Sequence, residues 1–240
     1  MATELVDIRV SATERMERVN PKSDSLKGEP VKIIVGDSNK VIYHVYEGVL
    51  RNKSAFFEAA LKKEWKEGTQ RIVKLPEEEP SVFCDFMQWL YTGRVPCIES
   101  LYHVEHEGYM QLVKLWLLAD HLIVANLQDS LVNAIVAASR EPFADRYPSA
   151  AVVEIVYQRT AVGSRLRKLM LDMYTRHVDI DWHIDNLNRE FAIDLLKALA
   201  SNRTTTDEAE PEFSQLFKGV PCRYHVHYDN KPCDGGADKA

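Results

Sequence analysis

The stretch from Val31 to Gly93 most constrains what this chain can fold into. Residues 31–35 and 41–45 are rich in β-branched side chains and flank a polar turn at 36–39, which predicts a β-hairpin. Residues 72–75 predict a third strand, which ends at Pro76 because proline cannot donate to a sheet ladder. The stretch holds no catalytic constellation, so we expect a surface that holds another protein.

Helices are predicted around these strands. Residues 46–50 and 54–61 are predicted to form two short helices, and Ser54 can cap the second. The clearest helix begins at Pro80, a favoured first position, and ends at a glycine. Cys84 lies in this helix and is expected to be a small buried group rather than a nucleophile. The apolar residues recur every three or four positions, as a buried stripe does, at Val82, Phe83, Phe86, Met87 and Leu90.

The second half of the chain shows helical apolar spacing throughout, so we predict an α+β fold: a small three-stranded sheet covered by helices, then an all-helical region. The expected division is a flexible leader at 1–29, the sheet-containing domain at 30–125, the helical region at 126–200, and a polar linker with a Cys/His tail at 201–240. Near residue 165 basic side chains, Arg167 among them, are expected on the solvated face of a helix.

Composition excludes several function classes. The formal charge of −6 argues against nucleic acid as the main partner, because phosphate binding needs a basic surface. No apolar run approaches the roughly 20 residues that span a bilayer, so no membrane is expected. Four cysteines without a secretion signal indicate reduced thiols in the cytoplasm or nucleus. No nucleophile elbow, phosphate-binding loop or dinucleotide fingerprint is present, so we expect a protein that is not an enzyme.

The pieces of the stretch, in their order and spacing, resemble the BTB/POZ domain, out to about residue 125. The sequence around residues 75–80 and 89–93 is most similar to fungal proteins with one BTB domain and a helical C-terminal half. The matching pieces are the first hairpin, His44, Leu50, Ser54 with Phe56-Phe57, Ile72-Val73-Lys74-Leu75-Pro76, and Phe83 through Trp89-Leu90-Tyr91-Thr92-Gly93.

This resemblance implies a non-enzymatic protein–protein interaction module. Some members bridge substrates to a cullin scaffold in a ubiquitin ligase, and carry an apolar-x-Glu motif after the Phe-Phe helix; here Trp65-Lys66-Glu67 falls at that place. The expected partner-binding residues are Phe56, Phe57, Trp65 and Glu67, with the exposed side of the helix at 112–122, although at least one of the two phenylalanines should be core. Alternatively, Trp65 covers a sheet edge and Glu67 is solvated.

A second function that the resemblance implies is a transcription- or chromatin-associated factor that uses the domain to oligomerise. It is the lower-ranked alternative, because neither a basic DNA-binding segment nor a standard zinc finger is present. Dimerising members have an apolar first helix and an Asp at the start of the first strand. Here the leader is polar and Pro30 stands at that place, so a homodimer is disfavoured.

The tail carries a complete set of zinc ligands. Cys222, His225, His227 and Cys233 supply two thiolates and two imidazoles, which is what a tetrahedral structural site needs. The spacing C-x2-H-x-H-x5-C is not that of a standard finger, but alternate histidines share one face of an extended segment. The sequence therefore predicts a structural zinc here, with a tail that holds two free thiols as the alternative.

Overall fold

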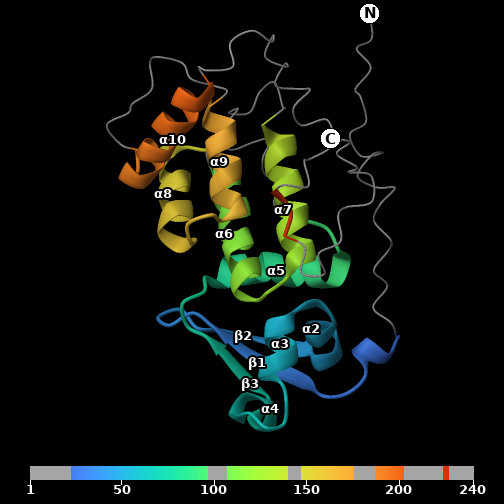
Figure 1. The fold of residues 1–240 in the computed structure, drawn as a ribbon. Coiled ribbons are helices and arrows are strands. Elements are labelled where there is room, and N and C mark those ends of the chain that lie inside the picture. Colours follow the sequence, from blue (N-terminus) through green and yellow to red (C-terminus); the bar gives the residue numbers. More distant parts are fainter. Residues whose placement is uncertain (1–22, 97–106, 140–146, 176–186, 203–223, 227–240) are drawn as a thin grey trace, which may run out of the picture. The chain divides into compact units, whose positions relative to one another are not determined.

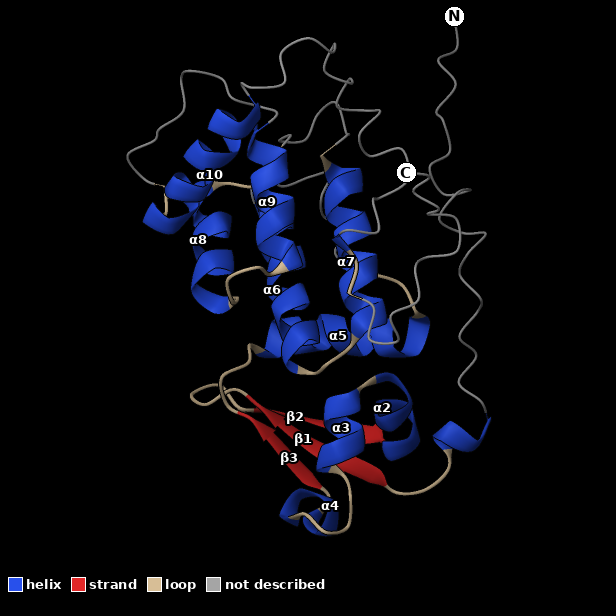
Figure 2. Ribbon diagram, viewed as in Figure 1, coloured by secondary structure: helices blue, strands red, loops and turns tan. Residues whose placement is uncertain are grey.

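The computed structural model describes residues 23–96, 107–139, 147–175, 187–202 and 224–226 (Figure 1). The chain divides into two compact units, one up to Arg94 and one from Val95. The first holds a sheet and helices, and the described part of the second contains helices and no strand (Figure 2). The α+β fold with a helical C-terminal region is confirmed. Most of the expected leader lies outside the described residues.

A three-stranded sheet in the order β2-β1-β3 is the frame of the first unit. The strands are β1 (Pro30–Val35), β2 (Val41–Tyr46) and β3 (Ile72–Leu75). β1 pairs with β2 antiparallel, as the predicted hairpin requires, and with β3 parallel. Alternate residues of β1 are fully buried, so one face of the sheet joins the core under the helices while the other stays partly exposed.

Short helices follow β2 in quick succession: α2 (Glu47–Lys53), α3 (Ala55–Ala60) and α4 (Lys66–Gln70). α2 contacts β2, α3 and the short 3-10 helix η1 (Ser23–Leu26). The contact with η1 needs a glycine, because a Cβ on Gly48 would lie 2.9 Å from the backbone of Ser25. Asn52 Nδ2 also donates to Ser25 Oγ at 2.8 Å, so η1 is fixed on α2.

Helix α5 (Pro80–Thr92) begins at the predicted proline and ends at Gly93, whose φ of 70° lies in the left-handed region that glycine favours. The predicted buried stripe is confirmed, except that Met87 is half-buried. Cys84, however, is exposed. Its position lies on the side of the helix opposite that stripe, so the expectation that it is a buried apolar group was wrong.

Five helices make up the described part of the second unit: α6 (Glu107–His121), α7 (Ala125–Ala138), α8 (Ala150–Arg159), α9 (Arg165–Thr175) and α10 (Arg189–Asn202). α6 packs on α7 and α8, and α8, α9 and α10 pack on one another. No helix among the described residues is long and apolar enough to cross a membrane.

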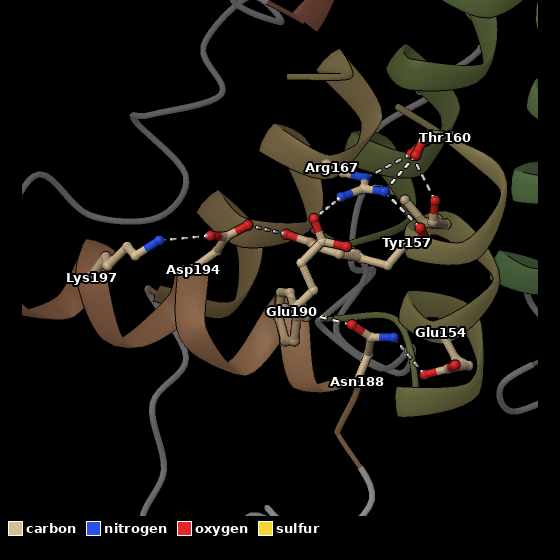
Figure 3. A network of polar contacts seen from close by, with 10 residues as sticks. Glu154, Tyr157, Thr160, Arg167, Asn188, Glu190, Asp194 and Lys197 are labelled. Atoms are coloured by element: carbon tan, nitrogen blue, oxygen red, sulfur yellow. Dashed lines mark hydrogen bonds and ion pairs between the residues drawn. The ribbon is translucent and has the colours of Figure 1, made fainter. Parts of the chain in front are cut away.

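Arg167 ties three of these helices together (Figure 3). Its Nη1 donates to Glu190 Oε1 on α10 at 2.8 Å, and its Nε donates to Thr160 Oγ1 at 3.0 Å. Nη2 donates to the carbonyl oxygen of Tyr157 at 2.6 Å and also to that of Thr160. The guanidinium lies 4.4 Å from the centroid of the Tyr157 ring.

The structure therefore corrects the expectation that Arg167 lies on the solvated face of its helix: the residue is 8 % exposed. The reason lies in the neighbouring helix. The last carbonyls of α8 have no partner within that helix, and the guanidinium of Arg167 supplies donors for them. A buried charge is tolerated because its donors are matched by a carboxylate, a hydroxyl and two carbonyl oxygens.

Candidate functional site

The candidate site starts at the N-terminus of α3, where Ser54 acts as the predicted cap. Its Oγ accepts from the backbone N–H of Phe57 at 3.2 Å, and the residue itself is 1 % exposed. This cap sets the helix so that Phe57 is fully buried and Phe56 is half-buried, with ring centroids 5.3 Å apart in an edge-to-face pair. Phe57 is thus the core member of the pair, and only Phe56 has surface to offer a partner.

The segment between α3 and α4 presents Trp65 to solvent. The indole is 59 % exposed, more than any other large apolar side chain described in this unit. Trp65 is the residue before the first turn of α4, in an extended conformation, and its N–H donates to the carbonyl oxygen of Lys62 at 3.0 Å. An exposed tryptophan on a hydrogen-bonded turn is typical of an interface anchor, because the ring loses little freedom on binding.

Two small residues of α4 close this turn. The hydroxyl of Thr69 lies 3.1 Å from the carbonyl oxygens of both Lys63 and Trp65. Gly68 lies directly against Lys62, since a Cβ there would be 2.1 Å from the carbonyl oxygen of Lys62. We call residues 62–69 the Trp65 turn. Gly68 and Thr69 were not predicted to belong to the site; a Gly-Thr pair after a lysine-rich segment is the local sign of such a closure.

Glu67 lies two residues beyond Trp65, in the first turn of α4, and is half-buried. A carboxylate suits this position because the first turn of a helix carries free N–H groups. Lys62, Lys63 and Lys66 around it are exposed. The turn therefore combines an aromatic ring with three lysines and two carboxylates, Glu64 and Glu67, of which Glu64 is exposed.

A network of ion pairs connects α2 and α3 with the residue that follows α4. Arg51 donates to both carboxylate oxygens of Glu58 at 2.8 Å and to Glu47 at 3.0 Å. The other oxygen of Glu47 accepts from Arg71 Nη1 at 2.8 Å. Arg71 ends α4 with a φ of 56°, and its carbonyl oxygen accepts from Lys32 N in β1 at 3.0 Å. The turn is thus anchored at its far end to the sheet.

These contacts shift the titration of both carboxylates. Burial disfavours the charged form of Glu47, but hydrogen bonds from Arg51 and Arg71 outweigh it and hold the pKa of Glu47 below its usual value. The hydrogen bonds from Arg51 likewise lower the pKa of Glu58. Both groups are therefore ionised at neutral pH, and the network is complete there.

Helix α6, which contains most of the predicted range 112–122, exposes less of its surface than the sequence predicted. Over residues 112–122, α6 exposes only Asp120 and His121 fully, and Lys114 in part. A helix that is apolar around most of its circumference is buried, and the four consecutive residues 115–118, which point to different sides of α6, are all buried. The helix is therefore mainly core of the second unit.

The predicted zinc site falls mostly outside the described residues. This is true of Cys222, His227 and Cys233, so their relative placement is not described. His225 is described; it is 6 % exposed, and its Nε2 lies 3.1 Å from Asn133 Oδ1. Within the described ranges, no group of three or more His, Cys, Asp or Glu side chains could hold a metal ion. The zinc site stays a prediction.

Comparison with known proteins bears on the first unit and the start of the second. The sequence model of the BTB/POZ domain matches residues 30–139. A search of curated proteins found no match. The matched range includes the sheet, the Trp65 turn and helices α2 to α7, so the resemblance noted in the sequence is confirmed at the level of the domain family. The similarity to fungal single-domain proteins stays a prediction.

Proposed function

Because residues 30–139 form a BTB/POZ domain, and such domains are protein–protein interaction modules, we propose that this chain is a substrate adaptor of a cullin-based ubiquitin ligase. The cullin scaffold binds the surface formed by Phe56, Trp65 and Glu67, while Phe57 supports it from the core. The observation that carries the proposal is the exposure of Trp65 on a closed turn, two residues before a carboxylate.

The surface suits a large partner because its parts have different tasks. The Trp65 ring is the apolar anchor that fills a groove, as central aromatic residues of interfaces do. Glu67 fixes the orientation by pairing with a cation of the scaffold. The three exposed lysines of the turn outnumber its two carboxylates, so the turn attracts an acidic surface at longer range, which raises the association rate and makes it dependent on salt.

The test is a binding measurement between a recombinant cullin and the full chain. We expect the double variant Trp65→Ala/Glu67→Ala to bind at least tenfold more weakly, because truncated anchor residues cost about 2 kcal/mol or more. The matched control is Ile42→Ala/Glu77→Ala, which removes an exposed apolar side chain and an exposed carboxylate elsewhere in the unit. Equal binding by both double variants, with unchanged thermal unfolding, contradicts the proposal.

The same measurements bear on the other expectations. A chain that binds no cullin and associates instead with transcription or chromatin proteins would favour the alternative function. BTB/POZ domains often dimerise, whereas we expect this chain to be a monomer in solution, because its leader is polar and Pro30 begins β1. Light scattering on the purified protein decides between the two states. We place the adaptor in the cytoplasm or nucleus.

A further inference from the structure

A short segment far along the chain is bound to the second unit. Residues Tyr224, His225 and Val226 lie against α7 and α9, and Figure 1 shows the segment in red beside α7. Tyr224 is fully buried and His225 is 6 % exposed. A tyrosine buried to this degree removes a large apolar area from water, so burial of its ring stabilises the bound segment.

Side chains of the helices bind the main chain of this segment. The N–H of Val226 donates to Asp129 Oδ1 on α7 at 2.6 Å. The carbonyl oxygen of His225 accepts from Arg165 Nη1 on α9. The backbone N–H of Val226 thus binds an acidic side chain, and the backbone C=O of His225 binds a basic one. Contacts of this kind bind the main chain of the segment whatever its side chains are.

Two further side chains recognise the sequence. The hydroxyl of Tyr224 donates to Asp172 on α9, and Nε2 of His225 lies 3.1 Å from Asn133 Oδ1 on α7. An amide oxygen only accepts, so Nε2 carries the hydrogen. A phenylalanine at position 224 would remove the hydrogen bond to Asp172. An alanine at position 225 would remove the contact with Asn133. This is the kind of discrimination that polar pockets provide.

The four recognising residues are arranged as a receptor on rigid elements. Asp129 and Asn133 are four residues apart on α7, and Arg165 and Asp172 are seven apart on α9, so each pair lies on one face of its helix. None of the four is buried, whereas other residues of the same helices fill the core. The receptor residues are therefore not needed to pack the unit.

We propose that this face of α7 and α9 is a peptide-recognition site for a Tyr-His sequence, which the chain fills with its own residues 224–226 and which the same sequence on another molecule can occupy. The argument is independent of the cullin proposal, because it uses only residues of the second unit. The occupant in cis has the advantage of a high effective concentration, so a peptide in trans competes with it.

The test uses the full chain with the site emptied. The variant Tyr224→Ala is titrated with a fluorescent peptide of residues 223–228, Arg-Tyr-His-Val-His-Tyr, and anisotropy reports binding. We expect saturable binding to the variant, and binding to the wild-type chain at least about tenfold weaker because its own segment competes. A peptide in which Phe replaces the first Tyr, the equivalent of Tyr224, should bind the variant about tenfold more weakly, since it loses a hydrogen bond to a carboxylate.

Second substitutions locate the site. In the Tyr224→Ala chain, adding Asp129→Ala or Arg165→Ala should weaken peptide binding at least about fivefold. Lys168→Ala, on the same helix as Arg165 but exposed, should leave it unchanged. Absence of saturable binding up to about 1 mM peptide, in the range of effective concentrations for a linked segment, overturns the proposal if circular dichroism shows a folded variant. Binding that Asp129→Ala and Arg165→Ala leave unaltered also overturns it.

A milder variant keeps the test decisive if Tyr224→Ala does not fold. His225→Ala leaves the buried tyrosine in place and removes the ring contact with Asn133. We expect this chain to bind the peptide more tightly than the wild-type chain, because its own segment competes less well. Identical affinity in the two folded chains contradicts a site that can exchange its occupant.

Discussion

Gly68 packs against the carbonyl oxygen of Lys62 so closely that a Cβ at this position would lie 2.1 Å from it. The atom in the way is backbone, which cannot rotate aside as a flexible side chain can. Glycine is therefore required where the first turn of α4 crosses the end of the preceding segment. The contact makes the Trp65 turn compact, and Thr69 reinforces it by hydrogen bonds from its hydroxyl.

The substitution Gly68→Ala should open the Trp65 turn while leaving its functional side chains in place. We expect a loss of about 1–3 kcal/mol of stability, the usual effect of forcing an extra group into a packed site. The exposed Lys62, Lys63 and Lys66 make the change measurable, because trypsin should cleave after them faster in the variant. Gln70→Ala, also exposed in α4, is the control and should cleave at the wild-type rate. Equal rates in all three chains would show that the closure is unimportant.

Gly68→Ala also tests how Trp65 is presented. If the ring binds the cullin from a fixed position, the variant should bind more weakly although Trp65 and Glu67 are both present. Full binding by a chain with an opened turn would mean that the anchor does not need to be held in place.

Arg167 should be among the most sensitive positions of the second unit. Replacing it with leucine removes the donors for Glu190 and for the carbonyl oxygens of Tyr157 and Thr160. We expect a loss of about 3 kcal/mol in the free energy of unfolding, measured with urea, because breaking a buried charge cluster leaves its partners unpaired.

Two further variants assign that loss to geometry. Arg167→Lys should recover only a small part of it, since an ammonium cannot reproduce the planar fork that serves the four acceptors. Lys168→Ala, the exposed neighbour, should change stability by no more than about 0.5 kcal/mol. If Arg167→Lys is as stable as the wild type, charge alone accounts for the contact.

Much of the first unit could be predicted from sequence because its signals are local. β-branched runs around a polar turn gave the hairpin of β1 and β2, and a glycine gave the end of α5. Helix α4 was missed, because its five residues carry no apolar stripe and depend on contacts with Lys62 and Lys63. Local pattern cannot reveal an element that tertiary contacts hold.

The expectations for Arg167 and Cys84 were wrong for a related reason. Arg167 was expected in water because arginine usually lies there, but the end of α8 creates acceptors only when the helices pack. Cys84 was expected inside because cysteine is usually buried, and its position on α5 decided otherwise. The polar residues that bind Tyr224 and His225 lie some 50 to 100 positions away in sequence, so no local pattern could identify them.

The tail zinc site remains open to a direct measurement. We expect about one zinc per chain by elemental analysis of protein purified without chelator, and its loss in Cys222→Ser, because thiolates are the strongest of the predicted ligands. Cys84→Ser, which changes an exposed thiol on α5, should keep the metal. A wild-type chain that contains no zinc would favour the alternative of two free thiols.

The ion pairs of Glu47 make stability depend on pH in a defined direction. Its pKa is lowered in the folded chain, so the stabilisation is present above the unfolded value near 4.5 and is lost as pH falls through the folded value. Arg51→Ala removes a chief cause of the shift and should lower the urea midpoint at pH 7. The gap between wild type and variant should narrow steadily below pH 4.5, because protonation of the carboxylates removes from the wild type the Arg51 contacts that the variant already lacks. Lys74→Ala, exposed on β3, controls for the loss of one positive charge and should show no such convergence. A gap for Arg51→Ala that stays constant down to pH 3 would mean that packing of the arginine stem, rather than ionisation of its partners, accounts for the loss.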